Sequence, residues 1–317
     1  MKRPQQHIPP IRKPDNTWAK TDLQKAETFA EHLTTVFRPL PPSLPNTHEE
    51  AILQQLNTPH QMAPPLLKIQ VQEVEHIIQS DTHPTKGPGY DLTTGKLLKE
   101  LPRKGIRAIT QIYNAIFRLT YFPTHWKIWQ IIMIPKPGKN PSEPTSHRPI
   151  SLLPLLSKIL EQIILKRLTP ILAANNTIPP HQFGFRPKYG TIQQVHRIIH
   201  RINNDMEHRR YCTAVFIDIS QAFDKVWHTG LLLKLKQALP HPAYTLLRSN
   251  LTDRMFLKSA IRRHIPHYTP FSQGYRKAAY LDQSYTLSSQ QICRNQNKRL
   301  PRRTLMILQS WHLMKTQ

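Results

Sequence analysis

Apolar residues recur at helical spacing in five stretches of the chain, and these stretches predict most of its regular structure. The predicted helices cover residues 21–37, 71–78, 106–117, 155–164 and 192–202. In the first, Phe29, Leu33 and Phe37 fall on one face, and Thr21 or Asp22 is placed to cap its start. We expect all five stripes to lie in a hydrophobic core.

Two compact apolar runs predict strands. Residues 128–134 form one run and stop at Pro135, and residues 212–217 form a second, β-branched run that ends at Asp218. A carboxylate at the end of a buried strand costs free energy unless something pairs with it. Asp218 therefore either binds a divalent metal or caps the helix that follows, and the local residues favour neither interpretation.

Proline marks the segments that we expect to lack a core. The chain has 317 residues, enough for two domains, with 30 prolines, nine glycines and no internal repeat. Residues 1–15 are basic, Pro-rich and predicted to be unstructured, and residues 38–65 are predicted to be a linker. Residues 1–65 would then be a Pro-rich basic linker that contains one helix.

Charge narrows the class of partner. The chain carries 44 Lys and Arg against 19 Asp and Glu, a net charge of +25. This balance favours a polyanion, most simply nucleic acid, with an anionic membrane surface as the competing interpretation. We find no long apolar run and no signal-peptide pattern, so we expect an intracellular protein that does not span a membrane. Two cysteines form no disulfide framework, and 17 histidines show no ligand spacing.

Four loop segments carry candidate chemistry. They are residues 86–91, 135–139, 148–151 and 182–186. In the first, Pro-Gly suits a type II turn. The other three supply Lys136, Lys139, Arg148 and Arg186, all upstream of Asp218. Singly, each cation is most simply a solvated loop residue. Together with a metal-binding Asp they suit a polyphosphate substrate, whose oxygens are bound by cations and metal.

Five motifs in order resemble a known family. They are Lys-x-Pro-Gly-x-Asp, Ile-Pro-Lys-Pro-Gly-Lys, Arg-Pro-Ile-Ser-Leu, Gln-Phe-Gly-Phe-Arg and Phe-Ile-Asp-Ile-Ser-Gln-Ala-Phe-Asp-Lys-Val-Trp-His. Their order resembles the reverse transcriptase of non-long-terminal-repeat retrotransposons, above all the jockey-like group, over residues 15–265. The resemblance implies an α+β right-hand polymerase, with fingers at 66–210, a partial palm at 211–270 and no thumb.

The same resemblance assigns roles to residues. It implies an RNA-directed DNA polymerase that takes an RNA template, a DNA primer and deoxynucleoside triphosphates. Asp218 and the backbone carbonyl of Ile219 would bind the catalytic magnesium ions. Phe223 would reject a ribose 2′-hydroxyl, although an ordinary core Phe is the alternative, and Asp224 would be structural. Lys136 and Arg148 would hold the triphosphate.

Three further cations have weaker assignments. Lys86, Lys139 and Arg186 would contact nucleic acid or support the fold.

Two family motifs are missing from the chain. Neither Tyr-Ala-Asp-Asp, which supplies a further catalytic carboxylate, nor Pro-Gln-Gly-Ser is present. The codons for residues 274–283 and 302–309 can encode both motifs in one alternative frame, although codon degeneracy could produce such a match by chance. We therefore predict a frameshift between residues 264 and 272, an out-of-frame, disordered tail at 271–317, and an inactive polymerase. The alternative function is a non-catalytic basic protein that binds RNA or DNA.

Overall fold

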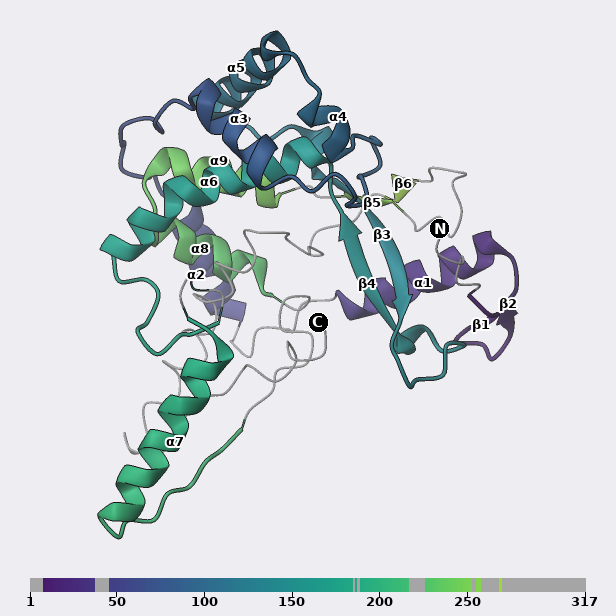
Figure 1. Ribbon diagram of the computed structural model, residues 1–317, viewed down its shortest axis with the longest axis vertical. Helices are drawn as coiled ribbons and strands as arrows, with labels where there is room; N and C mark the ends of the chain where they lie inside the picture. Colours follow the sequence, from purple (N-terminus) through teal and green to yellow (C-terminus); the bar gives the residue numbers. More distant parts are fainter. Residues whose placement is uncertain are drawn as a thin grey trace.

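Two hydrophobic cores organise the chain, one among helices and one between a sheet and a helix (Figure 1). The computed structural model describes residues 8–37, 46–184, 186, 189–216, 226–252, 255–257 and 268–269. Helices and sheet are both present, as the sequence predicts. The helical core forms one lobe, the sheet lies beside it, and one long helix projects away from both (Figure 1).

Five long helices supply most of the larger core. They are α3 (Val71–Ser80), α5 (Arg103–Leu119), α6 (Leu155–Ala174), α8 (His228–Ala238) and α9 (His241–Leu251). Polar contacts fix how these helices meet. The buried Tyr113 hydroxyl donates to the Leu156 carbonyl at 2.9 Å and so ties α5 to α6. The Arg167 guanidinium of α6 donates two hydrogen bonds, of 2.9 and 2.6 Å, to the Glu73 carboxylate of α3. The short helix α4 (Gly95–Lys99) and the 3₁₀ turns η1 (Thr124–Lys127) and η2 (Pro144–Ser146) connect the larger elements.

The sheet has a covered face and an open face. Its strands are β3 (Ile128–Pro135), β4 (His147–Leu152), β5 (Met255–Leu257) and β6 (Tyr268–Thr269), in the order β4-β3-β5-β6. Strand β3 pairs antiparallel with β4 and parallel with β5. Because side chains alternate along a strand, Trp129 and Ile131 enter the smaller core whereas Ile132 and Ile134 remain exposed. The predicted strand at 128–134 is confirmed.

The N-terminal residues cover the sheet. Helix α1 (Asp22–Val36) begins with a capping box in which Thr21 and Gln24 bond each other's backbone, as the sequence predicts for Thr21. Strands β1 (Ile11–Arg12) and β2 (Trp18–Ala19) pair before it. The prediction that residues 1–15 are unstructured is therefore wrong for β1. The Ile11 side chain is fully buried in the core shared with α1, which stabilises the pairing.

A second correction concerns the predicted linker at 38–65. Helix α2 (Asn46–Asn57) lies within it and packs against α8. The prolines of this region all lie outside residues 46–57, so the helix contains no breaker. The buried Lys236 of α8 donates to the carbonyls of Gln55, Leu56 and Thr58 at 2.6, 3.2 and 2.6 Å. This ammonium group places a positive charge on the carbonyls at the end of α2, where the helix runs out of backbone donors.

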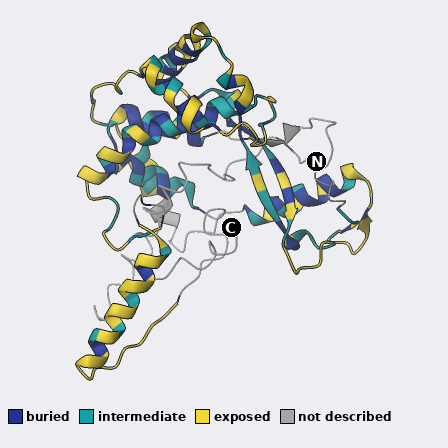
Figure 2. Ribbon diagram, in the orientation of Figure 1, coloured by how far each residue is buried: buried dark blue, intermediate teal, exposed yellow. Residues whose placement is uncertain are grey.

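Helix α7 (Thr191–Glu207) corrects the expectation that every apolar stripe is core. It projects from the helical lobe and is exposed along most of its length (Figures 1 and 2). The side chains of Ile192, Ile199 and Met206 are 72%, 51% and 67% exposed. The spacing predicts the helix correctly, but the described residues provide no element that covers this stripe.

The strand predicted at 212–217 is also wrong as far as the structure describes it. Residues 211–216 have no regular structure, and Val215 and Phe216 are exposed. A strand requires a paired neighbour, and the described residues place none beside this segment. The predicted helices at 21–37, 71–78, 106–117 and 155–164 are confirmed by α1, α3, α5 and α6. Among the described helices, none combines the length and apolar character needed to cross a membrane.

Candidate functional site

The tip of the β3–β4 hairpin holds two lysines on a tight turn. Lys136 and Lys139 flank Pro137 and Gly138, and the Lys139 amide donates to the Lys136 carbonyl at 3.4 Å. Gly138 has φ +73°, the left-handed value that the third position of a type II turn requires. Pro137 sets the second position of that turn. A Pro-Gly pair directly after a strand predicts a tight bend here, and the structure confirms it.

Arg148 joins the two lysines from the opposite strand. In the hairpin register it pairs with Ile134, two residues before Lys136, so it lies on the open face of the sheet. The Lys136 ammonium donates to the Thr145 carbonyl at 2.7 Å, which holds the side chain against the loop. Partial burial lowers the pKa of Lys136, and Lys139 and Arg148 lower it further. Lys139 and Arg148 are thus both close enough to repel the Lys136 ammonium, and an anion bound among them would relieve that repulsion. We call Lys136, Lys139 and Arg148 the hairpin cluster.

Two histidines lie behind the hairpin cluster. Burial lowers the pKa of His32 on α1, and Lys136 and His147 lower it further. Burial also lowers the pKa of His147, whose Nδ1 lies 3.1 Å from the Glu143 carbonyl and whose ring meets Phe29 edge-on. Both rings therefore favour the neutral form. The Glu143 carboxylate pairs with Arg12 at 3.7 Å and so is directed to a different cation.

Lys86 lies near the other end of β4. Its loop packs against the junction of β4 and α6, where a Cβ on Gly89 would come within 2.6 Å of the Pro154 nitrogen. Close backbone approach is therefore the reason for a glycine there. The predicted type II turn at Pro88-Gly89 is wrong, because the turns lie on either side, at His83–Lys86 and Gly89–Leu92. Gly138 is the one glycine of the described part with positive φ.

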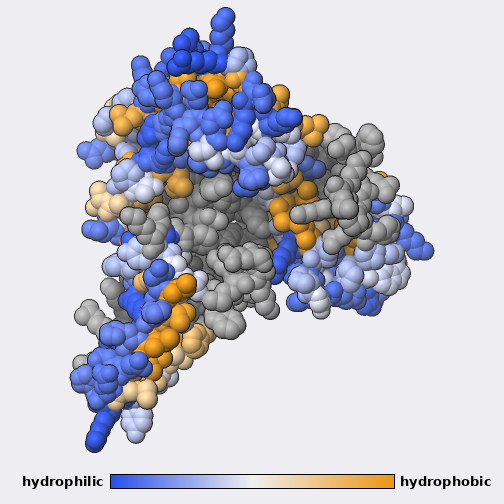
Figure 3. Space-filling view, viewed as in Figure 1, coloured by the Kyte–Doolittle hydropathy of each residue, from blue (hydrophilic) through white to orange (hydrophobic). Residues whose placement is uncertain are grey.

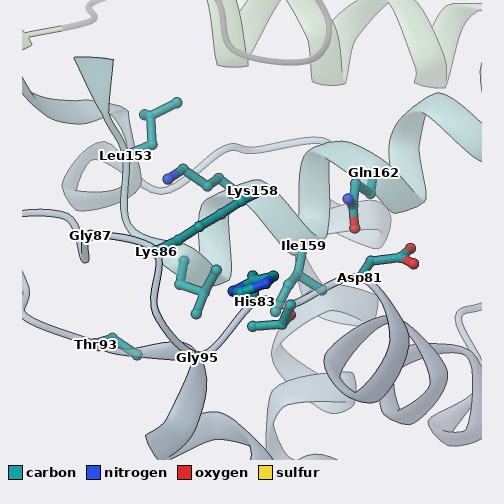
Figure 4. Close-up of a pocket in the computed structure, with 12 residues that line it drawn as sticks. Asp81, His83, Lys86, Gly87, Thr93, Gly95, Leu153, Lys158, Ile159 and Gln162 are labelled. Atoms are coloured by element: carbon teal, nitrogen blue, oxygen red, sulfur yellow. The ribbon is translucent and has the colours of Figure 1, made fainter. Parts of the chain in front are cut away.

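A small cavity of about 50 Å³ opens between this loop and the first turns of α6 (Figure 4). Lys86 lines it from the loop side and Lys158 from α6. Burial lowers the pKa of Lys158 and Lys86 lowers it further, whereas Glu161 and Asp91 act in the opposite direction. The acidic neighbours offset part of the positive charge, so this cavity is a weaker anion site than the hairpin cluster.

Lys158 was not among the sequence-predicted residues. It occupies the first turn of α6, close to the positive end of the helix dipole, where a cation is unfavourable. A lysine in the first turn of a predicted helix can be recognised from the sequence alone. What the sequence lacks is the approach of Lys86, which depends on the packing of Gly89.

Arg186 lies in the turn that leads into α7 and not at the hairpin. Its guanidinium donates to the carbonyls of Pro179 and Gln182 at 3.5 and 3.3 Å and stacks over the Tyr189 ring at 4.5 Å. These contacts fold the loop around Arg186. The structure therefore brings together Lys136, Lys139 and Arg148, and places Lys86 and Arg186 elsewhere.

The residues expected to bind metal and sugar lie outside the described residues. These are Asp218, Ile219 and Phe223, with Asp224 beside them. Within the described ranges, no three His, Cys, Asp or Glu side chains gather in a way that could hold a metal ion. The magnesium site at Asp218 stays a prediction.

Comparisons with known proteins test the resemblance directly. Residues 134–307 match the family described as "Reverse transcriptase (RNA-dependent DNA polymerase)". The chain is 44% identical over 255 residues to the probable RNA-directed DNA polymerase from transposon X-element of Drosophila melanogaster, covering 80% of this chain and 28% of that protein. It is 40% identical over 249 residues to the RNA-directed DNA polymerase from mobile element jockey of the same species, covering 78% and 27%.

The chain corresponds to one part of each relative. The chain spans little more than a quarter of the length of these relatives. The family match extends through residue 307 and so includes most of residues 271–317, where a frameshift is predicted. The frameshift stays a prediction. The relatives come from retrotransposons without long terminal repeats, as the motif order indicates. This chain belongs to the reverse transcriptase (RNA-dependent DNA polymerase) family.

Proposed function

We propose that this chain is the fingers and part of the palm of an RNA-directed DNA polymerase from a retrotransposon, and that the hairpin cluster binds the triphosphate of the incoming nucleotide. The observation that carries the proposal is the crowding of Lys136, Lys139 and Arg148 on one hairpin, where Lys139 and Arg148 both repel the Lys136 ammonium. A triphosphate supplies several oxygens and enough negative charge to occupy such a cluster.

Each residue of the cluster has a distinct task. Arg148 offers a planar fork of donors that can bind two phosphate oxygens at once. Lys136 is a point charge, held by the Thr145 carbonyl so that little of its side-chain freedom remains to be lost on binding. Lys139, at the end of the turn, is exposed and adds charge at the rim. The neutral His32 and His147 behind them add no further repulsion.

The reacting end of the nucleotide would meet residues assigned by family resemblance. Asp218 and the Ile219 carbonyl would hold magnesium, which stabilises the charge that develops on transferring phosphoryl groups. Phe223 would lie under the sugar and exclude a 2′-hydroxyl. These roles rest on the motif at residues 216–224.

Binding of a deoxynucleoside triphosphate without magnesium tests the hairpin cluster. A double variant, Lys136→Gln with Arg148→Gln, should bind a fluorescent triphosphate analogue at least roughly tenfold more weakly, because each charge-assisted hydrogen bond is worth about 1.5–3 kcal/mol. The matched control is Lys13→Gln with Lys20→Gln, which removes equal charge near β2 and should bind as the unsubstituted chain does. Equal weakening in both double variants would reduce the effect to net charge and contradict the proposal.

We further propose that the chain as written does not extend a primer, because the Tyr-Ala-Asp-Asp motif is missing. No product is expected from a primed RNA template with magnesium. Extension that disappears in Asp218→Ala would contradict this proposal. Sequencing the encoding locus tests the cause, since the codons for residues 302–308 should read Tyr-Ala-Asp-Asp in the alternative frame.

The second candidate is a non-catalytic protein that binds RNA or DNA. The net charge of +25 favours it independently of any catalytic residue. Such binding would be mainly electrostatic and should weaken steeply as salt rises. An unsubstituted chain that binds RNA but does not bind the triphosphate analogue would favour this second function.

A further inference from the structure

Helix α5 divides sharply between a buried apolar face and a basic face. Ile106, Tyr113 and Ile116 belong to the helical core. The other side carries Arg103, Lys104, Arg107 and Arg118, all of them exposed. The helix contains no Asp or Glu along its 17 residues. We call these four cations the α5 stripe.

Helical geometry places the four cations on one side of α5. With 3.6 residues per turn, they fall within an arc of about 100°, and Arg103 and Arg118 lie about 22 Å apart along the axis. Gln111 lies on the same arc and is exposed, so its amide can add a neutral hydrogen bond. Hydrophilic atoms project over α5 in the space-filling view (Figure 3).

The stripe lacks counter-charges within the described part of the chain. No ion pair or side-chain hydrogen bond joins its four cations to any described residue. Two arginines on other helices do pair with acids, since Arg167 lies 2.6 Å from Glu73 and Arg201 lies 3.1 Å from Asp205. A row of exposed like charges without acids presents a positive surface, so an external polyanion is the partner that it fits.

We infer that the α5 stripe is a second nucleic-acid contact, which binds the phosphate backbone of a single-stranded segment of the RNA template away from the hairpin cluster. This inference rests on the proposed function. Arg103 and Arg107 are an i, i+4 pair about 6 Å apart, and Arg118 lies about 16.5 Å further along the axis, so the stripe can contact several phosphates of one strand. It carries charge and hydrogen bonds but no base-sized pocket, so binding is sequence-independent.

The arrangement favours nucleic acid over a lipid surface. A helix that lies on a membrane inserts apolar side chains between its cations. Within the arc of the α5 stripe the remaining side chains are Gln111 and Asn114, and the Asn114 amide is engaged by the backbone of Ile69 at 2.8 and 2.9 Å. The exposed Ile112 and Leu119 lie outside that arc.

The test is the affinity of the full chain for an unstructured single-stranded RNA at several salt concentrations. A triple variant, Arg103→Gln with Arg107→Gln and Arg118→Gln, should bind roughly tenfold or more weakly at low salt. Its slope of log affinity against log salt should shrink in magnitude by about 2, since each contact to a single strand contributes about 0.7. A DNA strand of the same sequence should show the same change, because the phosphates are shared.

Two control variants separate charge, place and folding. Arg103→Lys with Arg107→Lys and Arg118→Lys keeps the charges and should keep the salt slope. Lys13→Gln with Lys20→Gln and Arg209→Gln removes equal charge far from α5 and should also keep it. Each variant is first compared with the unsubstituted chain by circular dichroism.

The outcomes distinguish the two proposals. RNA binding that is equally strong in the α5 triple variant overturns the α5 stripe and leaves the proposed function standing. An unsubstituted chain that shows no RNA binding overturns both. Binding to vesicles of anionic lipid, lost in the triple variant while RNA binding persists, identifies a membrane surface and also overturns the inference.

Discussion

Helices α5 and α7 have the same length, and both pair an apolar stripe with a basic side, yet only α5 buries its apolar stripe. The apolar face of α5 is buried under α3 and α6, and Tyr113 even reaches across to the Leu156 carbonyl. The apolar stripe of α7 faces outward, and Figure 3 shows it as a hydrophobic band along the projecting helix. Periodicity therefore specifies which side of a helix is apolar, whereas tertiary contacts decide whether that side is buried.

The largest expected difference in the free energy of unfolding comes from an isoleucine-to-alanine substitution made in each of the two helices. Ile116 on α5 is 5% exposed and Ile199 on α7 is 51% exposed. Ile116→Ala should lower the free energy of unfolding by about 2–5 kcal/mol, because it removes buried methyl groups and leaves a cavity. Ile199→Ala should change it by less than about 0.5 kcal/mol. Urea denaturation followed by circular dichroism measures both values. Similar losses in the two variants would mean that the α7 stripe is packed in solution.

An intermediate contrast comes from ion pairs. Arg167 joins two helices and its pair is mostly buried, with side chains 20% and 15% exposed. Arg201 pairs within α7 and is 53% exposed. Arg167→Ala should cost about 3 kcal/mol of unfolding free energy, because Glu73 would be left buried without a partner. Arg201→Ala should cost about 0.3–0.5 kcal/mol, and Arg210 remains to pair with Asp205. A larger loss for Arg201→Ala would reverse the comparison.

The smallest expected effect is a dependence on pH in the sheet core. The pKa values of His32 and His147 are lowered in the fold, so the unfolded chain binds protons more readily than the folded chain. The free energy of unfolding should therefore fall as pH drops below about 6.5, the ordinary pKa of histidine. Unfolding measured at about pH 7.5 and about pH 5.5 gives this slope. His147→Gln should flatten it, and an unchanged slope would show that this ring contributes nothing.

Local chemistry made some features predictable from the sequence. The Pro137-Gly138 turn depends on two residues with fixed backbone preferences, and the Thr21 cap depends on a contact three residues away. Strand β3 was equally clear, because Pro135 closes a compact apolar run. Each of these predictions uses information from a short stretch of chain.

Other features depend on contacts between distant segments. Lys86 and Lys158 meet because Gly89 lets one backbone approach another, and a single glycine in a Pro-Gly pair equally suggests a turn. Helix α2 was missed because the surrounding prolines dominate the composition of residues 38–65. The residue that binds the end of this helix, Lys236, lies 181 residues from Gln55 and so gives no local signal. The exposure of α7 and of residues 211–216 follows from which elements lie beside them, which periodicity does not encode.

The parallel pairing of β3 with β5 has a consequence for synthesis. Ile128 pairs with Met255, so one edge of β3 has no partner strand until the ribosome has added another 127 residues. At typical ribosome speeds of about 5–20 residues per second, that interval lasts roughly 6–25 s. During this time the nascent β3–β4 hairpin has an unpaired backbone edge and exposed isoleucines. Cotranslational protection of that edge, by a chaperone or by slow release from the ribosome, would govern the yield of folded chain.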